Sequence, residues 1–184
     1  MKIQCDCGSF QAELANSPKN SPGRLVCYCD DCQAFAEMLE RTDVLDEFGG
    51  TEVVPAYPSD ITFIKGESNL CYSQVTQNGL YRFSTTCCNS PIVNTRPNFP
   101  WAGIFHSAYT AADTQALKKF GEIRGRIRGT YAKGNPDFKV SDKIGARDML
   151  TVLPFVVKGK LFGKHKGSPF FENDGATPIG LKRP

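Results

Sequence analysis

Seven of the eight cysteines in this chain of 184 residues fall into three tight clusters, and that clustering constrains the fold more than any other feature. Cysteines in a C-x-C sequence are too close to bridge each other without strain, and disulfide frameworks usually spread their cysteines between elements. Thiolates that gather on tight turns from distant parts of a chain are typical of tetrahedral zinc sites. We therefore predict a fold organised around two zinc ions. The predicted metal ligands are Cys5, Cys7, Cys87, Cys88, Cys27, Cys29 and Cys32.

The spacing favours one closed site and one open site. Cys5 and Cys7 form a compact C-x-C-G turn, and Gly8 relieves the crowding behind it. The simplest partner of this turn is a second two-cysteine turn, at Cys87 and Cys88, which completes four ligands. The triplet C-x-C-x-x-C, at positions 27, 29 and 32, then supplies three ligands to a second zinc. A coordination position that is left open in this way is the mark of a site that binds something.

Two alternatives to this division stay open. A distant side chain, such as His106, Cys71 or an aspartate, would close the triplet site and make it purely structural. Otherwise we expect Cys71 to be a small buried apolar residue and His106 to be packed or exposed. Adjacent cysteines can both reach one metal only where the backbone turns sharply. Without such a turn, Cys87 would face the triplet instead.

The donor set of the open site predicts its chemistry. Three thiolates donate much charge, so their zinc is a weak Lewis acid whose bound water ionises poorly. Such a metal suits a fourth soft ligand, namely an exogenous thiolate. The predicted guest is a small thiol that attacks or releases an electrophile such as an aldehyde. The predicted catalytic residues are Cys27, Cys29 and Cys32.

The composition is ordinary for a globular protein, with 40% hydrophobic and 22% charged residues. No apolar run approaches the roughly 20 residues that span a membrane, and the N-terminal residues lack the apolar segment of a signal peptide. We therefore expect a cytoplasmic protein whose thiols stay reduced. The net charge of +3 divides into −6 over residues 1–117 and +9 over residues 118–184. We favour the reading that the basic part neutralises the acidic part and the thiolates over the reading that it binds anions.

Local patterns predict a mainly β protein of the α+β class, because the predicted strands follow one another instead of alternating with helices. Extended stretches at 11–14 and 24–26 flank a turn-rich loop and predict a hairpin. A second hairpin is predicted at Asn78-Gly79. Further strands are expected at 52–56, 60–65, 69–76, 79–84 and 122–128.

Three helices are expected. Cys32 opens the first, with Phe35, Met38 and Leu39 at helical spacing. The second is expected near 110–120. The third covers 143–163, where Pro154 must kink or interrupt it, and the chain from residue 167 is expected to be extended coil.

These motifs resemble the family of glutathione-dependent formaldehyde-activating enzymes and centromere protein V. The family pattern is C-x-C-G, then C-x-C-x-x-C, then F-C-x-x-C-G-S-x-L. The first two motifs match at Cys5-Asp6-Cys7-Gly8 and at Cys27-Tyr28-Cys29-Asp30-Asp31-Cys32. The third motif reads Phe83-Ser84-Thr85-Thr86-Cys87-Cys88-Asn89-Ser90-Pro91-Ile92, which puts Thr85 where the family has its first cysteine. The altered third motif indicates a separate branch of the family.

The resemblance extends over residues 3–130 and implies a β-tent zinc-binding fold of small antiparallel sheets with peripheral helices. It implies a structural zinc at Cys5, Cys7 and Cys88, with Cys87 as the best candidate for the fourth ligand, and a substrate-facing zinc at the triplet. The implied activity joins formaldehyde to glutathione as S-hydroxymethylglutathione, a carbon–sulfur lyase reaction in reverse. We expect a single domain over residues 1–184, in which residues 1–130 carry the resemblance and residues 131–184 form a basic extension.

The expected partners are a small thiol such as glutathione and a small aldehyde, without a membrane. Arg124, Arg126 and Arg128 would share one face of a strand, either to bind carboxylates and phosphates or as a solvated face. The lysines at 158, 160, 164 and 166 resemble a phosphate-binding stripe, but only one aromatic residue is interleaved, so nucleic acid is not expected. A zinc-stabilised interaction module without activity and a thiol redox sensor stay open as alternatives, as does a homo-oligomer.

Overall fold

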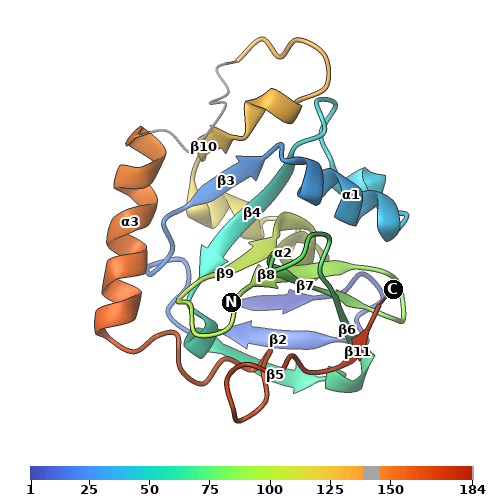
Figure 1. Cartoon of the computed structure of the whole chain (residues 1–184), viewed down its shortest axis with the longest axis vertical. Coiled ribbons are helices and arrows are strands. Elements are labelled where there is room, and N and C mark those ends of the chain that lie inside the picture. The colour runs from blue at the N-terminus through green and yellow to red at the C-terminus, as the bar shows by residue number, and fades with distance from the viewer. Residues whose placement is uncertain (139–145, 184) are drawn as a thin grey trace.

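The structure is a computed structural model that describes residues 1–138 and 146–183, apart from the side chains of residues 146–149 and 151. The described part consists mainly of β-strands, arranged in one eight-stranded and one three-stranded sheet, with three α-helices around them (Figure 1). The predicted fold class, mainly β within α+β, is confirmed. No helix of the described part has both the length and the apolar character needed to cross a membrane.

The large sheet is antiparallel through its centre and parallel at both edges. Its order is β10 (Ile123–Ile127), β3 (Arg24–Cys27), β4 (Thr51–Ala56), β9 (Ala102–Phe105), β8 (Pro91–Thr95), β7 (Tyr81–Thr85), β6 (Leu70–Ser73) and β11 (Leu181–Lys182). The parallel pairs are β10 with β3 and β11 with β6. The small antiparallel sheet has the order β1 (Lys2–Gln4), β2 (Gln11–Leu14) and β5 (Ile61–Lys65).

Different elements pack against the two faces of the large sheet. Neighbouring residues of a strand point to opposite faces, so each strand contributes side chains to both. The first face shares the main core with the small sheet and with α2 (His106–Ala112), and includes Val54, Phe83, Val93 and Ile104. The second face packs against α1 (Asp30–Met38) and α3 (Ala146–Leu161) through a smaller cluster. That cluster includes Leu25, Phe35, Leu39, Val53, Phe105 and, at its border, Val152.

The predicted hairpin between residues 11–14 and 24–26 is wrong. β2 pairs with β1 on one side and with β5 on the other, so both of its edges are already occupied. β3 lies in the large sheet, between β10 and β4. The turn-rich loop after β2 therefore carries the chain from one sheet to the other, which a local pattern does not reveal.

The other predicted strands are present as β4, β5, β6, β7 and β10, and the hairpin at Asn78-Gly79 joins β6 to β7. This hairpin has a longer loop than a two-residue turn, because β6 ends at Ser73 and β7 begins at Tyr81. Four strands, β1, β8, β9 and β11, were not predicted.

The helices differ from expectation in their bounds. α1 begins two residues before Cys32 and buries Phe35 and Leu39, whereas Met38 is 36% exposed. The single helix predicted near 110–120 is wrong, because α2 ends at Ala112 and a separate 3₁₀ turn spans Ala116–Phe120. α3 continues past Pro154 without interruption, and its predicted start at 143 lies outside the described residues. The Pro154 side chain is exposed, so water can satisfy the backbone carbonyl that loses its partner.

The chain from residue 167 is not simple coil, since it contributes to the main core. Phe170 is fully buried and contacts Phe63 and Phe83. Phe171 is buried beside it, and β11 then pairs with β6.

The Phe170→Ala variant should lose about 3–5 kcal/mol of unfolding free energy, because a buried aromatic side chain leaves a cavity when it is removed. The measurement is urea unfolding, and the matched control is Phe162→Ala. Phe162 is 71% exposed, so its removal should change stability by no more than about 0.5 kcal/mol. Equal effects in the two variants would show that the C-terminal segment does not belong to the core.

Candidate metal centres and the adjoining cavity

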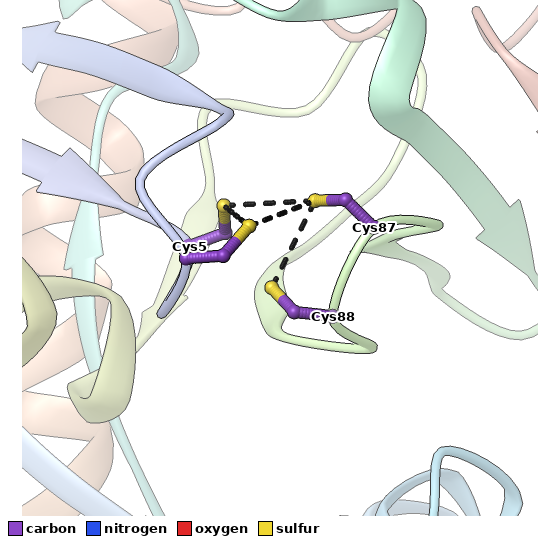
Figure 2. A group of neighbouring side chains, drawn as sticks. Cys5, Cys87 and Cys88 are labelled. Atoms are coloured by element: carbon purple, nitrogen blue, oxygen red, sulfur yellow. Dashed lines mark hydrogen bonds between the residues drawn. The ribbon is translucent and has the colours of Figure 1, made fainter.

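The first group of cysteines lies between two loops of different sheets. Cys5 and Cys7 occupy the loop between β1 and β2, and Cys87 and Cys88 occupy the turn between β7 and β8. The sulfur atoms of Cys5, Cys87 and Cys88 point toward one another across the gap between the loops (Figure 2). Together with Cys7, all four sulfur atoms lie within 4.8 Å of one another.

The sulfur spacing in this four-cysteine group fits a tetrahedral metal ion. A metal–sulfur distance of about 2.3 Å, the usual value for zinc, places the sulfurs of a tetrahedron about 3.8 Å apart. The sulfur of Cys87 lies 3.8 Å from that of Cys5, 3.3 Å from that of Cys7 and 3.8 Å from that of Cys88. These four residues could therefore hold a metal ion.

Two residues in the left-handed region shape the loops. Gly8 has φ of 71°, and a Cβ there would meet only a side-chain atom of Gln11 at 4.0 Å. Gly8 therefore supplies the backbone conformation, and the predicted relief of crowding is wrong. Asn89 has φ of 54° directly after the adjacent cysteines, and asparagine tolerates this region better than most residues. The sharp turn that the sequence left open is present, and Cys87 does not face the triplet.

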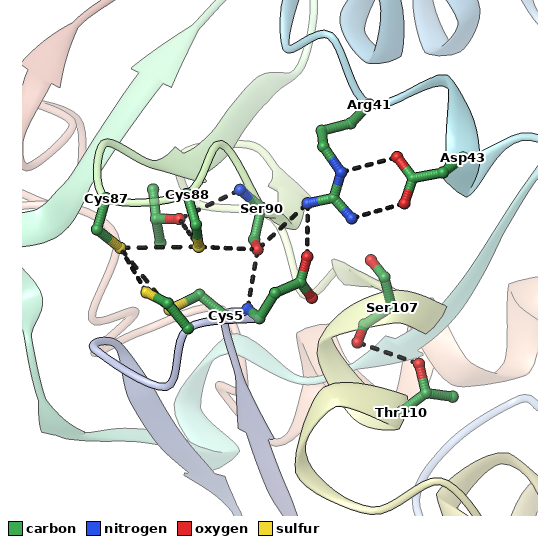
Figure 3. Close-up of polar contacts among 11 residues, drawn as sticks. Cys5, Arg41, Asp43, Cys87, Cys88, Ser90, Ser107 and Thr110 are labelled. Carbon is green, nitrogen blue, oxygen red and sulfur yellow. Dashed lines mark hydrogen bonds and ion pairs between the residues drawn. The ribbon is translucent and has the colours of Figure 1, made fainter.

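A hydrogen-bonded frame joins the two loops on one side of the four-cysteine group (Figure 3). The backbone N–H of Asp6 donates to Ser90 Oγ at 2.9 Å, and the same oxygen lies 3.2 Å from the sulfur of Cys88. Arg41 pairs with the carboxylate of Asp6 at 2.7 Å and with that of Asp43 at 2.7 Å. Its guanidinium also donates to Ser90 Oγ at 3.4 Å, so one arginine braces both loops.

The C-terminal segment also contacts the turn between β7 and β8. The Arg183 guanidinium donates to the Thr85 carbonyl at 3.3 Å and to Asn89 Oδ1 at 3.0 Å. Thr85, at the position where the resembled family has a cysteine, lies with its Oγ1 3.5 Å from the sulfur of Cys88. The same oxygen accepts a hydrogen bond from the backbone N–H of Ser90 at 3.2 Å, so Thr85 stabilises the turn.

The thiols of this group differ in acidity. Burial opposes ionisation of Cys88, but the hydrogen bonds from Ser90, Thr85 and the backbone near Cys7 outweigh it and lower the pKa of Cys88 to about 6. Burial and the neighbouring thiol of Cys7 raise the pKa of Cys87 to about 12. The surroundings therefore favour at least one thiolate at neutral pH, and thiolates are the form that binds metal.

The second group, the cysteine triplet, lies where β3 ends and α1 begins. Cys27 is the last residue of β3, Cys29 is the N-cap of α1, and Cys32 lies in the first turn of the helix. Their sulfur atoms lie within 4.8 Å of one another. The positive end of the helix dipole faces this group and favours thiolates there. These three residues could hold a metal ion as well.

A buried arginine stands against the cysteine triplet. Arg82, on β7, is 2% exposed, and its Nη1 donates to the sulfur of Cys32 at 3.6 Å. Its Nη2 lies 3.9 Å from Asp31, and its guanidinium lies over the ring of Phe35. A guanidinium cannot release its proton in a protein, so this buried charge needs negative neighbours. Thiolates of the triplet provide them.

The three thiols of the triplet also differ in their pKa values. Hydrogen bonds from Cys27 and Cys29, with the charge of Arg82 beside them, hold the pKa of Cys32 well below its usual range. The pKa of Cys27 is raised, because it shares hydrogen bonds with the other two thiols and is buried. The surroundings therefore favour the thiolate form at Cys32.

No further protein ligand completes the triplet among the side chains that the structure describes. A fourth histidine, cysteine, aspartate or glutamate ligand atom within 4.8 Å of all three sulfurs is absent from that set. His106 opens α2 and lies with Nδ1 3.2 Å from the Glu52 carbonyl. Cys71 is buried in β6, with its sulfur 3.3 Å from Ser84 Oγ. Neither of these two candidates closes the site.

A cavity of about 560 Å³ opens beside the triplet. Its apolar wall comes from the second face of the large sheet, from the loop between β8 and β9 and from α3, and includes Leu25, Val53, Phe99, Trp101, Val152 and Val156. Its polar lining includes Asp31, Arg82, Asn94, Arg96 and Arg128. The volume is within the usual range for a small-molecule pocket, and a mostly apolar lining with a few polar groups is typical of one.

The three alternating arginines do not share one face as predicted. β10 has an irregular register between Ile123 and Gly125, and it ends before Arg128, which has φ of 63°. Only Arg128 lines the cavity, whereas the guanidinium of Arg126 lies 4.2 Å from the ring centre of Phe138. The lysine run is partly engaged as well, since Lys164 pairs with Asp60 and Lys160 donates to the Asn98 carbonyl.

Sequence reasoning missed Arg82, Asn94 and Arg96. The signal for Arg82 was present, because an arginine between Tyr81 and Phe83 in a predicted strand points to the face opposite the buried Phe83. Asn94 lies near the end of β8 and Arg96 directly follows this strand, which was not predicted.

Comparison with known proteins gives a family without a described activity. A family of unknown function, DUF6151, matches residues 1–180. The chain belongs to this family. The DUF6151 match includes α3 and Phe170, which lie beyond the residues that carry the motif resemblance. A search of curated proteins found no match. The chain is similar to a Rhodobacter sphaeroides protein of known crystal structure, with 19% identity and a TM-score of 0.44 over 67% of this chain and 97% of that chain.

Proposed function

We propose that this protein binds a small thiol such as glutathione at a zinc ion held by Cys27, Cys29 and Cys32, and that it joins the thiol to a small aldehyde or releases it. The observation that carries this proposal is a three-cysteine group that borders a cavity and lacks a fourth ligand among the described side chains. The four-cysteine group serves as the closed zinc site that holds two loops together. The motif resemblance to glutathione-dependent formaldehyde-activating enzymes supports the same chemistry.

The residues around the triplet have separable roles. Zinc, when bound, would supply an open coordination position that stabilises a fourth thiolate. Arg82 offsets the negative charge of the three cysteine ligands from within the protein. Arg96 and Arg128 attract anionic groups of the ligand to the cavity. The apolar wall limits the access of water to the reacting atoms.

The reaction balances without an oxidant or a reductant. In the forward direction the thiolate sulfur donates an electron pair to the carbonyl carbon, and a carbon–sulfur bond forms. The carbonyl π electrons move to the oxygen, which takes a proton from water. In the reverse direction the hydroxyl proton returns to water, the carbon–sulfur bond breaks, and the electron pair stays on sulfur.

Isothermal calorimetry on the zinc-loaded protein tests the thiol step. Glutathione should bind with a dissociation constant at or below the millimolar range, and Cys29→Ser should abolish the binding. Arg124→Gln is a suitable control, since Arg124 is exposed on β10 and is not among the residues that line the cavity. An absence of binding at millimolar glutathione would overturn the proposal.

A further inference from the structure

The third helix forms part of the cavity wall. α3 is fixed by Phe155, whose ring stacks on Tyr57 at 4.2 Å and whose carbonyl accepts a hydrogen bond from the Tyr57 hydroxyl at 2.8 Å. A Cβ at Gly159 would lie 2.6 Å from both Tyr57 and Pro100, so only glycine allows the helix to approach this closely. The helix is thereby held against the sheet by its inner face.

Two valines of α3 line the cavity as a result. Val152 and Val156 lie one helical turn apart, before and after Phe155 in the sequence, and both are half-buried. Trp101 continues this wall, since its ring packs edge-on against Phe155 and its indole N–H donates to Asn94 Oδ1 at 3.3 Å. A polar ligand gains little from such a wall, whereas an apolar group gains by leaving water.

The cavity also offers two exposed cations. Arg96 follows the end of β8, and Arg128 follows the end of β10, next to the strand that carries Cys27. Neither forms an ion pair with a carboxylate among the described residues. Arg128 occupies the left-handed region, which is uncommon for a long side chain and is found more often where function requires it.

We infer that the thiol recognised here is amphipathic, with an anionic group for Arg96 and Arg128 and an apolar substituent against Val152, Val156 and Trp101. This inference rests on the proposed function, since the triplet holds the sulfur. It predicts that thiols less polar than glutathione bind more tightly than glutathione does. α3 is the element that selects them.

N-acylcysteines with acetyl, butanoyl and hexanoyl chains test the apolar part by calorimetry on the zinc-loaded protein. Each added methylene should tighten binding about fourfold, because burial of a CH₂ group contributes about 0.8 kcal/mol. N-hexanoylcysteamine, which lacks the carboxylate, should bind at least about tenfold more weakly than N-hexanoylcysteine.

Two variants of one helix provide the matched control. Val156→Thr keeps the side-chain shape but replaces a methyl group of the wall by a hydroxyl, so it should weaken the hexanoyl compound at least fivefold and leave the acetyl compound unchanged. Val157→Thr, on the outward face where Val157 is 47% exposed, should change neither.

The outcomes separate this inference from the proposed function. If N-acetylcysteine binds but chain length has no effect, the inference is wrong and the thiol site stands. If N-hexanoylalanine, which lacks the thiol, binds as tightly as N-hexanoylcysteine, the apolar wall stands and the thiol site is wrong. If no compound binds, both are wrong.

Discussion

The Cys29→Ser protein should contain one metal ion per chain, whereas the wild type should contain two. Cys29 supplies one of the three sulfurs at the triplet, and the described side chains offer no fourth ligand there, so its loss should leave two sulfurs and a metal affinity too low to survive purification. The four-cysteine group lies in other loops and keeps its ion. Elemental mass spectrometry on protein purified without added metal measures the ratio directly.

Cys71→Ser is the matched control for this substitution. Cys71 lies outside both groups, and its sulfur already contacts the Ser84 carbonyl and hydroxyl, which a serine can also do. This variant should therefore retain two ions. One ion in the wild type, unchanged by Cys29→Ser, would show that the triplet is empty as purified and would remove the basis of the proposed function.

Replacement of Arg82 by methionine should lower the affinity of the triplet for zinc by about 10- to 100-fold, the usual effect of losing a group that supports metal ligands. A zinc ion with three thiolates would carry a net charge of −1, and Arg82 is the buried cation beside the sulfur of Cys32. Methionine fills a similar volume but leaves that charge unbalanced in a site shielded from water. Competition with a chromophoric chelator measures the affinity.

Two further arginine variants make this test specific. Arg82→Lys keeps the charge and should recover part of the affinity, although lysine has no planar guanidinium to reach Cys32 and Asp31 together. Arg24→Met removes an arginine of β3 that pairs with Glu52 at 2.6 Å, and it should leave zinc affinity unchanged. Unchanged affinity in Arg82→Met would mean that Arg82 serves packing alone.

The two cysteine groups were predictable because the spacing of the cysteines along the chain leaves few ways to combine them. A loop with two cysteines needs a second pair to complete four metal ligands. Three cysteines within six residues already lie close enough to form a group of their own. The direction of Cys87 was not predictable, because it depends on a left-handed residue at Asn89 that many sequences would not adopt. Local spacing therefore indicated most members of each group, while backbone conformation decided that Cys87 joins the four-cysteine group.

The large sheet was less predictable than the sites. Local patterns detected most strands but gave no information on which sheet each strand joins, and so β2 and β3 were wrongly paired. β8 begins at a proline and β9 contains Gly103, so each of these short strands has a weak β pattern. The cavity combines β3, β7, β8 and α3, and no local pattern could have brought Val156 to Cys27 from opposite ends of the chain.

The two-residue strand β11 at the edge of the large sheet affects when that sheet can be completed during synthesis of the chain. β6 is complete at Ser73, but its partner β11 is synthesised more than 100 residues later. At roughly 5–20 residues per second, the outer edge of β6 waits about 5–20 seconds on the ribosome with unpaired backbone groups. An open edge of this kind can pair with another nascent chain. A chain that stops before residue 181 would therefore be expected to aggregate rather than to persist as a smaller protein.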